Sequence, residues 1–325
     1  MAREVFADLA KGAGIVLVLI GHSNVPFWLI NLIYFFHMPL FVILSGIFHK
    51  PQAKVHETAI KSTKVLFTYI FYGVFFLFWD YILSGKLELQ NISSFVFLKA
   101  SIYSIPYFGV FWFVVVLFFI RILAISMRIN YLMFLGSGLI YFLLSLYPNY
   151  LSNLPLCLGQ VFLLYVFYVT GVIMKPMLFS FPKKILFGSV LVFLIFLCVS
   201  CYYFSITEYK LVNYHNLLVF NPFLALVMAL SGSFGLISLT ILISKFQNAF
   251  LRFMRFIGEF SFSFLALHLF SFSVIGGWLS KLGLHGHSKV FVTIVFSVSI
   301  ISIFIYLIEK FLSRIVFFKR IFLFQ

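Results

Sequence analysis

The chain has 325 residues, of which 63% are hydrophobic and only 10% are charged. Soluble domains are about half apolar and a quarter charged, so this composition excludes an ordinary soluble protein and indicates an integral membrane protein. The net charge of +15 does not indicate nucleic-acid binding, because the basic residues are scattered between hydrophobic runs. The three cysteines, Cys157, Cys198 and Cys201, fit neither a disulfide framework nor a four-ligand metal site.

Long apolar runs alternate with short polar segments, which is the pattern of a polytopic helical bundle. With about 20 residues for each crossing, we predict an all-α fold of about ten transmembrane helices in a single domain over residues 1–325. The start, MAREVFADLAKG, has no small-residue cleavage site, so we expect the first span to remain in the protein. The expected spans are residues 12–30, 32–48, 65–83, 108–126, 131–148, 156–174, 185–206, 217–243, 257–279 and 290–309.

The distribution of Lys and Arg predicts the orientation of these spans. With the N-terminus inside, all but five of the 23 basic residues lie in the cytoplasmic segments, and both termini are then cytoplasmic. The five expected outside are Lys86, Lys99, Lys210, Lys281 and Lys289.

The first span, in KGAGIVLVLIGH, joins a lysine and a histidine. Lys11 and His22 are eleven residues apart, which in an α-helix is about 16.5 Å and about 20° more than three full turns, so both lie on one face. Asp8 extends this polar stripe toward the N-terminus. An ionisable residue within a membrane helix usually has a function, which makes His22 a candidate catalytic residue. The alternative is a core histidine that bonds to a backbone carbonyl.

A second histidine, His37, follows in YFFHMPLFVILSG. If the first hairpin turns near residues 29 and 30, His22 and His37 have similar depths on antiparallel helices and line one cavity. A neutral imidazole accepts a proton from a hydroxyl near pH 7, so this position suits a general base. A structural role is the alternative for His37 as well. We expect no metal site, because no acidic or cysteine partner lies at a matching depth.

Two lysines precede the third span in HKPQAKVHETAIKSTK. Lys61 and Lys64 are spaced i, i+3 and therefore lie on one helix face. They are candidates to hold a phosphate-bearing ligand that approaches from the cytosol. The alternative is contact with anionic lipid on the cytoplasmic side.

Four later segments carry notable residues. Trp112 lies well within the fourth apolar run, where an aromatic residue usually faces lipid or the core, and residues 231–235 form a seam of small residues suited to close helix packing. Glu259 and His268 are nine residues apart in the expected ninth span, about 180° around one helix, so we do not expect both to face one cavity. His285, in the loop GLHGHS, is expected to be exposed.

The segment FADLAKGAGIVLVLIGH followed by YFFHMPLFVILSG resembles the acyltransferase-3 family of integral membrane O-acyltransferases. The first helix of that family carries a basic residue, ten intervening positions and a histidine. Lysine as the basic residue, Lys11, resembles the fucose 4-O-acetylase-like branch. Lys61 and Lys64 stand where the family has a basic pair, although lysine lacks the bidentate phosphate contacts of arginine. Trp112 and the segment FMRFIGEFSFSFLALH are similar to its later helices.

The resemblance implies a cytosolic acyl-CoA donor, usually acetyl-CoA, and no permanently bound cofactor. It implies an acceptor hydroxyl on a sugar of a cell-surface polysaccharide or lipid-linked glycan, at a multi-pass protein of the bacterial plasma membrane. We expect His22, with His37 beside it, to act as the general base or to engage the thioester directly. The residues expected to bind the donor are Lys11, Lys61, Lys64 and Trp112.

A transporter or flippase for a glycolipid or small anion is the alternative function, since a basic entrance and central histidines also suit a permeation path. Two observations argue against it. The sequence has no visible internal repeat, and it carries the histidine signature on two consecutive helices. A purely structural membrane subunit fits the composition but leaves the stripe from Lys11 to His22 unexplained.

Overall fold

The computed structural model describes residues 2–50, 55–86, 89–96, 106–127, 129–147, 154–204, 211–307 and 310. The described part is helical apart from one short two-stranded hairpin. Its elements, in chain order, are α1 (Ala2–Gly21), α2 (Phe27–Ile47), α3 (Val55–Ser84), α4 (Leu89–Val96), η1 (Pro106–Val110), α5 (Trp112–Ser126), α6 (Tyr131–Leu146), η2 (Pro155–Cys157), α8 (Leu158–Ser180), α9 (Lys183–Phe204), β1 (Val212–Asn213), η3 (Tyr214–Asn216), β2 (Leu218–Val219), α10 (Pro222–Ile243), α11 (Ala249–Glu259), α12 (Ser261–Lys281) and α13 (Gly286–Leu307).

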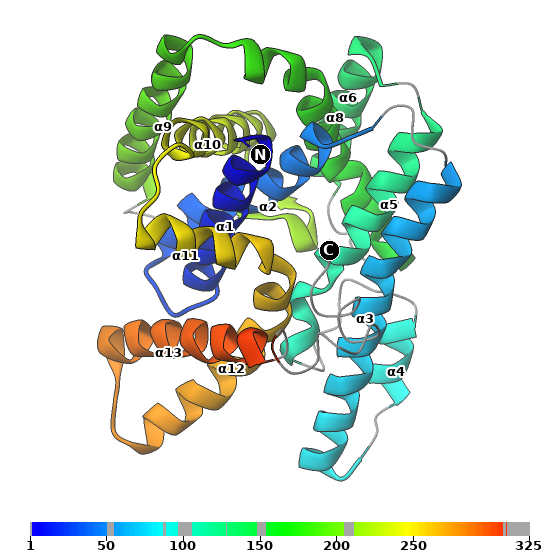
Figure 1. Ribbon diagram of the computed structural model, residues 1–325. Helices are drawn as coiled ribbons and strands as arrows, with labels where there is room; N and C mark the ends of the chain where they lie inside the picture. The colour runs from blue at the N-terminus through cyan, green and yellow to red at the C-terminus, as the bar shows by residue number, and fades with distance from the viewer. Residues whose placement is uncertain are drawn as a thin grey trace.

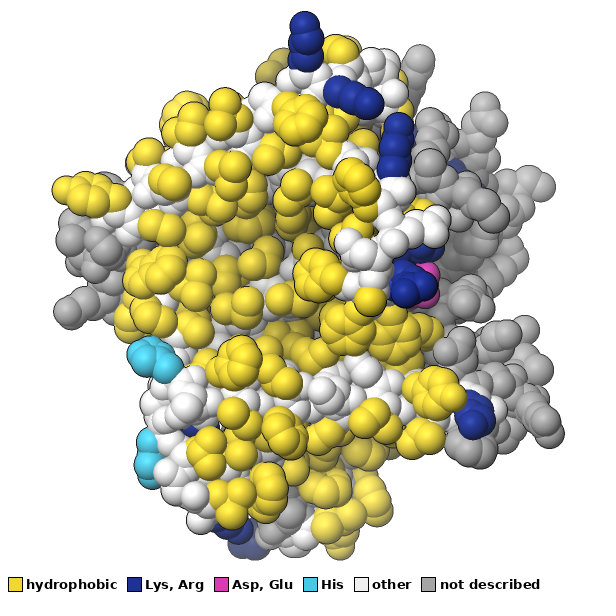
Figure 2. Space-filling model, turned by 60° about the vertical axis from the view of Figure 1, so that its left-hand side comes forward, with side chains coloured by type: hydrophobic (Ala, Val, Ile, Leu, Met, Phe, Trp, Pro, Cys, Tyr) yellow, Lys and Arg dark blue, Asp and Glu magenta, His cyan; other side chains and the backbone are white. Residues whose placement is uncertain are grey.

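Six of the described helices, α2, α8, α9, α10, α12 and α13, are long and apolar enough to cross a membrane. Residues 69–82 of α3 and the helices α5 and α6 are shorter apolar helices. The face shown in Figure 2 is largely hydrophobic, with Lys and Arg at its margins. These features confirm the predicted all-α bundle of a multi-pass membrane protein.

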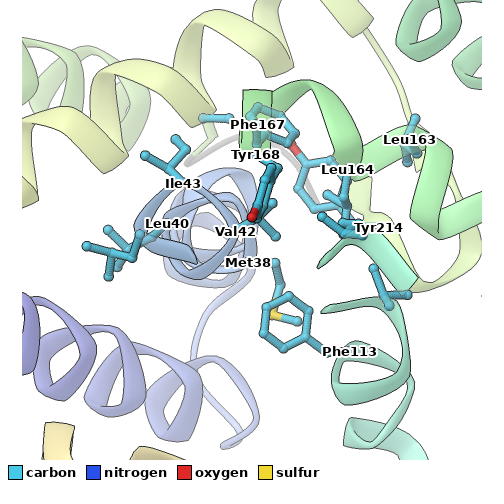
Figure 3. Packing of buried hydrophobic residues seen from close by; sticks show 14 of the residues in the cluster. Met38, Leu40, Val42, Ile43, Phe113, Leu163, Leu164, Phe167, Tyr168 and Tyr214 are labelled. Carbon is cyan, nitrogen blue, oxygen red and sulfur yellow. The ribbon is translucent and has the colours of Figure 1, made fainter. Parts of the chain in front are cut away.

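The helix α2 lies near the centre of the molecule and packs against α1, α8, α9 and α10 (Figure 1). Its backbone touches that of α8, because a Cβ added at Gly46 would overlap the carbonyl oxygen of Tyr168. Figure 3 shows side chains of α8 packed against one side of α2, with Met38 next to Phe113 of α5. This core fixes α2 and, with it, the position of His37.

The first hairpin turns earlier than the sequence predicts. The helix α1 ends at Gly21 and α2 begins at Phe27, after Pro26, so the prediction of a turn near residues 29 and 30 is wrong. Gly21 faces Ile33 and Tyr34 of α2. His37 therefore lies about one helical turn, roughly 5 Å, further along α2 than the residues opposite Gly21.

The expected ninth span is divided into two helices. The short helix α11 ends at Glu259 and α12 begins at Ser261, with Phe260 between them. Glu259 and His268 thus belong to different helices, and the angle of about 180° predicted for one continuous helix does not apply. The position of Glu259 thus depends on the packing of α11, and that of His268 on the packing of α12.

The small-residue seam of α10 is confirmed. Gly232 lies against the ring of Phe36 in α2, where an added Cβ would come within 2.5 Å of ring carbon Cγ. The hydroxyl of Ser233 donates a hydrogen bond to the carbonyl of Phe36 at 3.4 Å. Gly235 similarly packs against Phe193 of α9. Small residues here let α10 approach both neighbours closely.

A short hairpin between α9 and α10 reaches into the bundle, with Val212 paired to Val219. Two hydrogen bonds tie it to α2. The backbone N–H of Leu211 donates to Oδ1 of Asn31 at 2.9 Å, and the hydroxyl of Tyr214 donates to the carbonyl of Phe35 at 3.2 Å. The hairpin is thereby held against the helix that carries His37.

Candidate active site

Both predicted catalytic histidines line one cavity of about 240 Å³, which we call the histidine cavity. His22 follows the last residue of α1, and His37 lies in the middle of α2. Tyr34 lies between them, with its ring centroid 6.0 Å from that of His22 and 5.0 Å from that of His37. The remaining lining residues are Val18, Met38, Gly109, Val110, Trp112, Asn213, Tyr214, His215, Leu265 and Leu269.

The hydrogen bonds of these histidines define which ring nitrogen is basic. Nδ1 of His22 lies 2.9 Å from the carbonyl oxygen of Val18, and Nδ1 of His37 lies 2.8 Å from that of Ile33. A carbonyl only accepts hydrogen bonds, so Nδ1 carries the proton in the neutral ring and Nε2 holds the lone pair. The carbonyl bond expected of a structural histidine is therefore present in both, and it also prepares Nε2 as a proton acceptor.

The end of α1 favours positive charge on His22. Backbone carbonyls at a helix C-terminus carry a partial negative charge, which stabilises a nearby cation by about 0.3–1 kcal/mol. The backbone N–H of His22 donates to the carbonyl of Val18 at 3.0 Å, and the Ser23 hydroxyl donates to that of Ile20 at 2.6 Å. The turn that follows α1 thus holds the ring in place at the C-terminal end of the helix.

A third histidine, His268 of α12, packs against His22. The ring centroids are 5.1 Å apart with planes at 72°. Nδ1 of His268 donates to the carbonyl of Leu265 at 2.7 Å, and the side chain is completely buried. Its Nε2 has no hydrogen-bond partner among the residues that the structure describes. The ring that packs edge-on against His22 is therefore a fully buried imidazole with one nitrogen free among the described residues.

A second space of about 250 Å³, the lysine cavity, lies next to the histidine cavity. Lys11 lines it and forms an ion pair with Asp8 at 2.6 Å. Arg121 of α5 also lines it, and its Nε donates to the hydroxyl of Ser45 at 3.0 Å. The complete set of lining residues is Lys11, Ile15, Met38, Phe41, Phe113, Val114, Leu117, Arg121, Glu259, Ser261, Phe262 and Leu265.

The two cavities share Met38 and Leu265. The apolar side chains of Met38 and Leu265 therefore border both a space with two cations, Lys11 and Arg121, and the space that holds the histidines. Lys11 and His22 stand at the two ends of this path, and both belong to α1 or its final turn. The predicted stripe on α1 thus borders two neighbouring cavities, with Lys11 on one and His22 on the other.

The structure brings together some of the predicted donor-binding residues but not all. Lys11 lines the lysine cavity, and Trp112 lines the histidine cavity, where its ring lies 5.4 Å from that of His215. Lys61 and Lys64 belong to α3, but their side chains lie outside the described residues. Their role in binding the donor stays a prediction.

Sequence reasoning missed three residues of the site. Arg121 entered only the orientation argument, although an arginine within an apolar helix is itself a sign of function. His268 was weighed only against Glu259 on one helix, and the break at Phe260 removes that relation. His215 reaches the histidine cavity on the hairpin, where Nε2 of Gln160 donates to its carbonyl at 2.7 Å. No spacing in the sequence could have indicated that contact.

Comparison with protein-family models agrees with the chemistry of the cavities. The acyltransferase 3 model, described as an acyltransferase domain, matches residues 4–308, which is most of the chain. Comparison with curated proteins and with solved structures finds no match. The chain therefore belongs to the acyltransferase 3 family and is a multi-pass membrane acyltransferase.

Proposed function

We propose that this protein is an O-acetyltransferase that moves an acetyl group from cytosolic acetyl-CoA to a sugar hydroxyl of a cell-surface polysaccharide or lipid-linked glycan. His22 acts as the general base. The lysine in place of arginine at Lys11 favours the fucose 4-O-acetylase-like branch of the family. With the proposed orientation, the protein lies in a bacterial plasma membrane with both termini in the cytoplasm.

The observation that carries this proposal is the junction of the lysine cavity and the histidine cavity at Met38 and Leu265. An acyl-CoA has a phosphate-rich end and a long thin arm that ends in the thioester. The lysine cavity, with Lys11 and Arg121, suits the anionic end. The histidine cavity suits the thioester, because its lining is largely apolar apart from the groups that would react or donate hydrogen bonds.

The charges of the lysine cavity are partly balanced before a donor binds. Asp8 pairs with Lys11, and Glu259 lines the same space as Arg121. A phosphate that binds there would compete with these carboxylates for the two cations. Because salt screens these charge interactions, the affinity for the donor should depend on ionic strength. In the absence of a donor, the ion pair with Asp8 keeps Lys11 in position.

The chemical step follows from the tautomer of His22. Nε2 takes the proton of the acceptor hydroxyl as its oxygen attacks the thioester carbonyl carbon. The new C–O bond forms, the C–S bond breaks, and the CoA thiolate receives the proton from the His22 imidazolium. During this step the C-terminal end of α1 stabilises the positive charge on His22, whose ring is held edge-on against that of His268.

Thiol release tests the proposal. Purified protein in lipid nanodiscs receives acetyl-CoA and a panel of surface-glycan acceptors, and free CoA thiol is followed over time. General base catalysis contributes about 10² to 10⁴ in rate, so His22→Ala should lower acceptor-dependent thiol release at least about a hundredfold while the protein stays folded. His287→Ala is the matched control, because His287 is exposed and lines none of the cavities described above. Near-normal turnover of His22→Ala would contradict the assignment.

A further inference from the structure

A third pocket adjoins His22 on the side away from the lysine cavity. This turn pocket has a volume of about 320 Å³ and lies between the turn that follows α1, the second half of α12 and the start of α13. His22 lines both the turn pocket and the histidine cavity. The residues that line the turn pocket are His22, Ser23, Asn24, Phe272, Gly276, His285, Gly286, Lys289, Val290 and Thr293.

The lining of the turn pocket has the chemistry of a site for a charged sugar. Ser23 and His285 supply hydrogen-bonding groups, and Phe272 supplies an aromatic ring on which the apolar face of a sugar can pack. Lys289 is the cation, with its Nζ 2.6 Å from the hydroxyl of Ser280. The residues that line this pocket include no Asp or Glu, so nothing in the lining neutralises the lysine. An anionic, hydroxyl-rich ligand matches this combination.

The position of the pocket gives such a ligand a role. The lysine cavity begins at Lys11, and the turn pocket begins at His22, about 16.5 Å further along α1. Gly286 and Lys289 belong to the start of α13, which the distribution of basic residues predicts to lie on the outer side. A ligand in the turn pocket would thus lie against His22, at the end of α1 opposite to Lys11.

We propose that the turn pocket binds the acceptor as a glycosyl phosphate and presents its hydroxyl to His22, with Lys289 holding the phosphate. This inference rests on the proposed function, since it names the acceptor of the same reaction. It also makes His285 part of the lining of a binding site, whereas the sequence predicts only that this residue is exposed in a loop.

A protection experiment tests the pocket without relying on turnover. In a variant that lacks the three natural cysteines, Asn24→Cys is labelled with a membrane-impermeant charged thiol reagent, with and without hexose 1-phosphates and N-acetylhexosamine 1-phosphates. We expect these probes to slow the labelling of Asn24→Cys. Ser288→Cys, exposed beside Lys289 but outside the pocket lining, is the matched control and should label at an unchanged rate. Absence of protection at Asn24→Cys, or equal protection at both sites, would overturn the proposal.

A charge variant tests the role of the lysine. Losing one charge-assisted hydrogen bond should raise the half-protecting concentration of a glycosyl phosphate about tenfold in Lys289→Gln. Lys281→Gln, an exposed lysine at the end of α12, should leave it unchanged. Unchanged protection in Lys289→Gln would refute phosphate binding at this lysine. A polyprenyl-linked glycosyl phosphate that protects at lower concentration than the free sugar phosphate would identify a membrane-bound source, and equal concentrations would identify a soluble one.

The outcome for the turn pocket is separable from that for the reaction. If thiol release depends on His22 but no probe protects Asn24→Cys, the acceptor site is wrong and the proposed function stands. If protection occurs without any acceptor-dependent thiol release, the pocket binds glycosyl phosphates but the proposed transfer is wrong. Labelling of Asn24→Cys from the side of Lys11 alone would contradict the opposite approach of donor and acceptor.

Discussion

The closest approach between α1 and α11 offers a direct test of how the lysine cavity is built. A Cβ added at Gly258 would overlap the carbonyl oxygen of Asp8, and one added at Gly12 would overlap that of Met254. The two backbones are therefore in contact at both glycines. Lys11 is adjacent to Gly12, and Glu259 is adjacent to Gly258, so this contact places both charged side chains on the lysine cavity. We predict that Gly258→Ala separates the two helices at this point.

The size of the effect follows from what the new methyl group meets. A flexible side chain can move aside, but a carbonyl within a helix can move only with its helix. Overpacking of this kind costs about 1–3 kcal/mol, and the rigid backbone places Gly258→Ala toward the upper end of that range. Loss of one charge-assisted contact to a phosphate, when Lys11 shifts, should raise the KM for acetyl-CoA roughly ten- to a hundredfold.

Two measurements on matched variants check this reasoning. The free energy of unfolding in detergent and the KM for acetyl-CoA are determined for Gly258→Ala and for Gly136→Ala. Gly136 lies within α6 with no atom within 4 Å of an added Cβ, so alanine there should be neutral or stabilise by up to about 1 kcal/mol through helix propensity. If Gly258→Ala behaves like Gly136→Ala in both measurements, the inferred backbone contact between α1 and α11 is refuted.

Three further variants probe the site and its surroundings. Arg121→Gln should raise the KM for acetyl-CoA about tenfold, whereas exposed Arg252→Gln should not, and equal values would exclude Arg121 from donor binding. His268→Gln should lower kcat roughly ten- to a hundredfold without raising that KM; an unchanged kcat would mean that His268 is only a packing residue. Burial and the nearby charge of Lys175 lower the pKa of His49. As the pH drops below about 6.5, His49 therefore gains a proton in the unfolded chain before it does so in the folded chain, and the free energy of unfolding should fall. The unfolding temperature measured between pH 5 and 8 should show this loss in the wild-type protein and a smaller loss in His49→Gln. The same pH dependence in both proteins would contradict a contribution from His49.

The sequence predicts the broad organisation well because strong signals control it. Apolar runs long enough to cross a membrane leave few alternatives to helices, and the residues flanking several helices indicate where they begin. Oδ1 of Asn221 accepts a hydrogen bond from the backbone N–H of Leu224, and Asn130 caps α6 in the same way. The relation between Lys11 and His22 was equally predictable, because Lys11 lies on a regular helix and His22 follows its last residue, with its backbone N–H still bonded to the carbonyl of Val18.

The parts of the site that the sequence missed depend on contacts between segments. The alignment of α1 with α2 depends on how Gly21 packs against Tyr34. Spacing along the chain does not reveal this contact between two helices. No proline or glycine at the break near Phe260 indicates in the sequence that a helix ends there, because Gly258 belongs to the preceding helix. A hydrophobic pattern that runs on through a break predicts one helix where the structure has two.

The charges on α1 explain why this helix occupies the middle of the molecule. In contact with lipid, the charges of Asp8 and Lys11 would be costly. The helix instead packs against α2, α10, α11 and α12, and its polar stripe faces cavities between them. Charged residues largely enclosed by packed helices, such as Asp8 and Lys11 with side chains 18% and 33% exposed, are retained at such a cost only where they perform a function or hold a structure together. The lysine cavity at one end and His22 at the other give α1 the first of these reasons, and the close contact with α11 gives it the second.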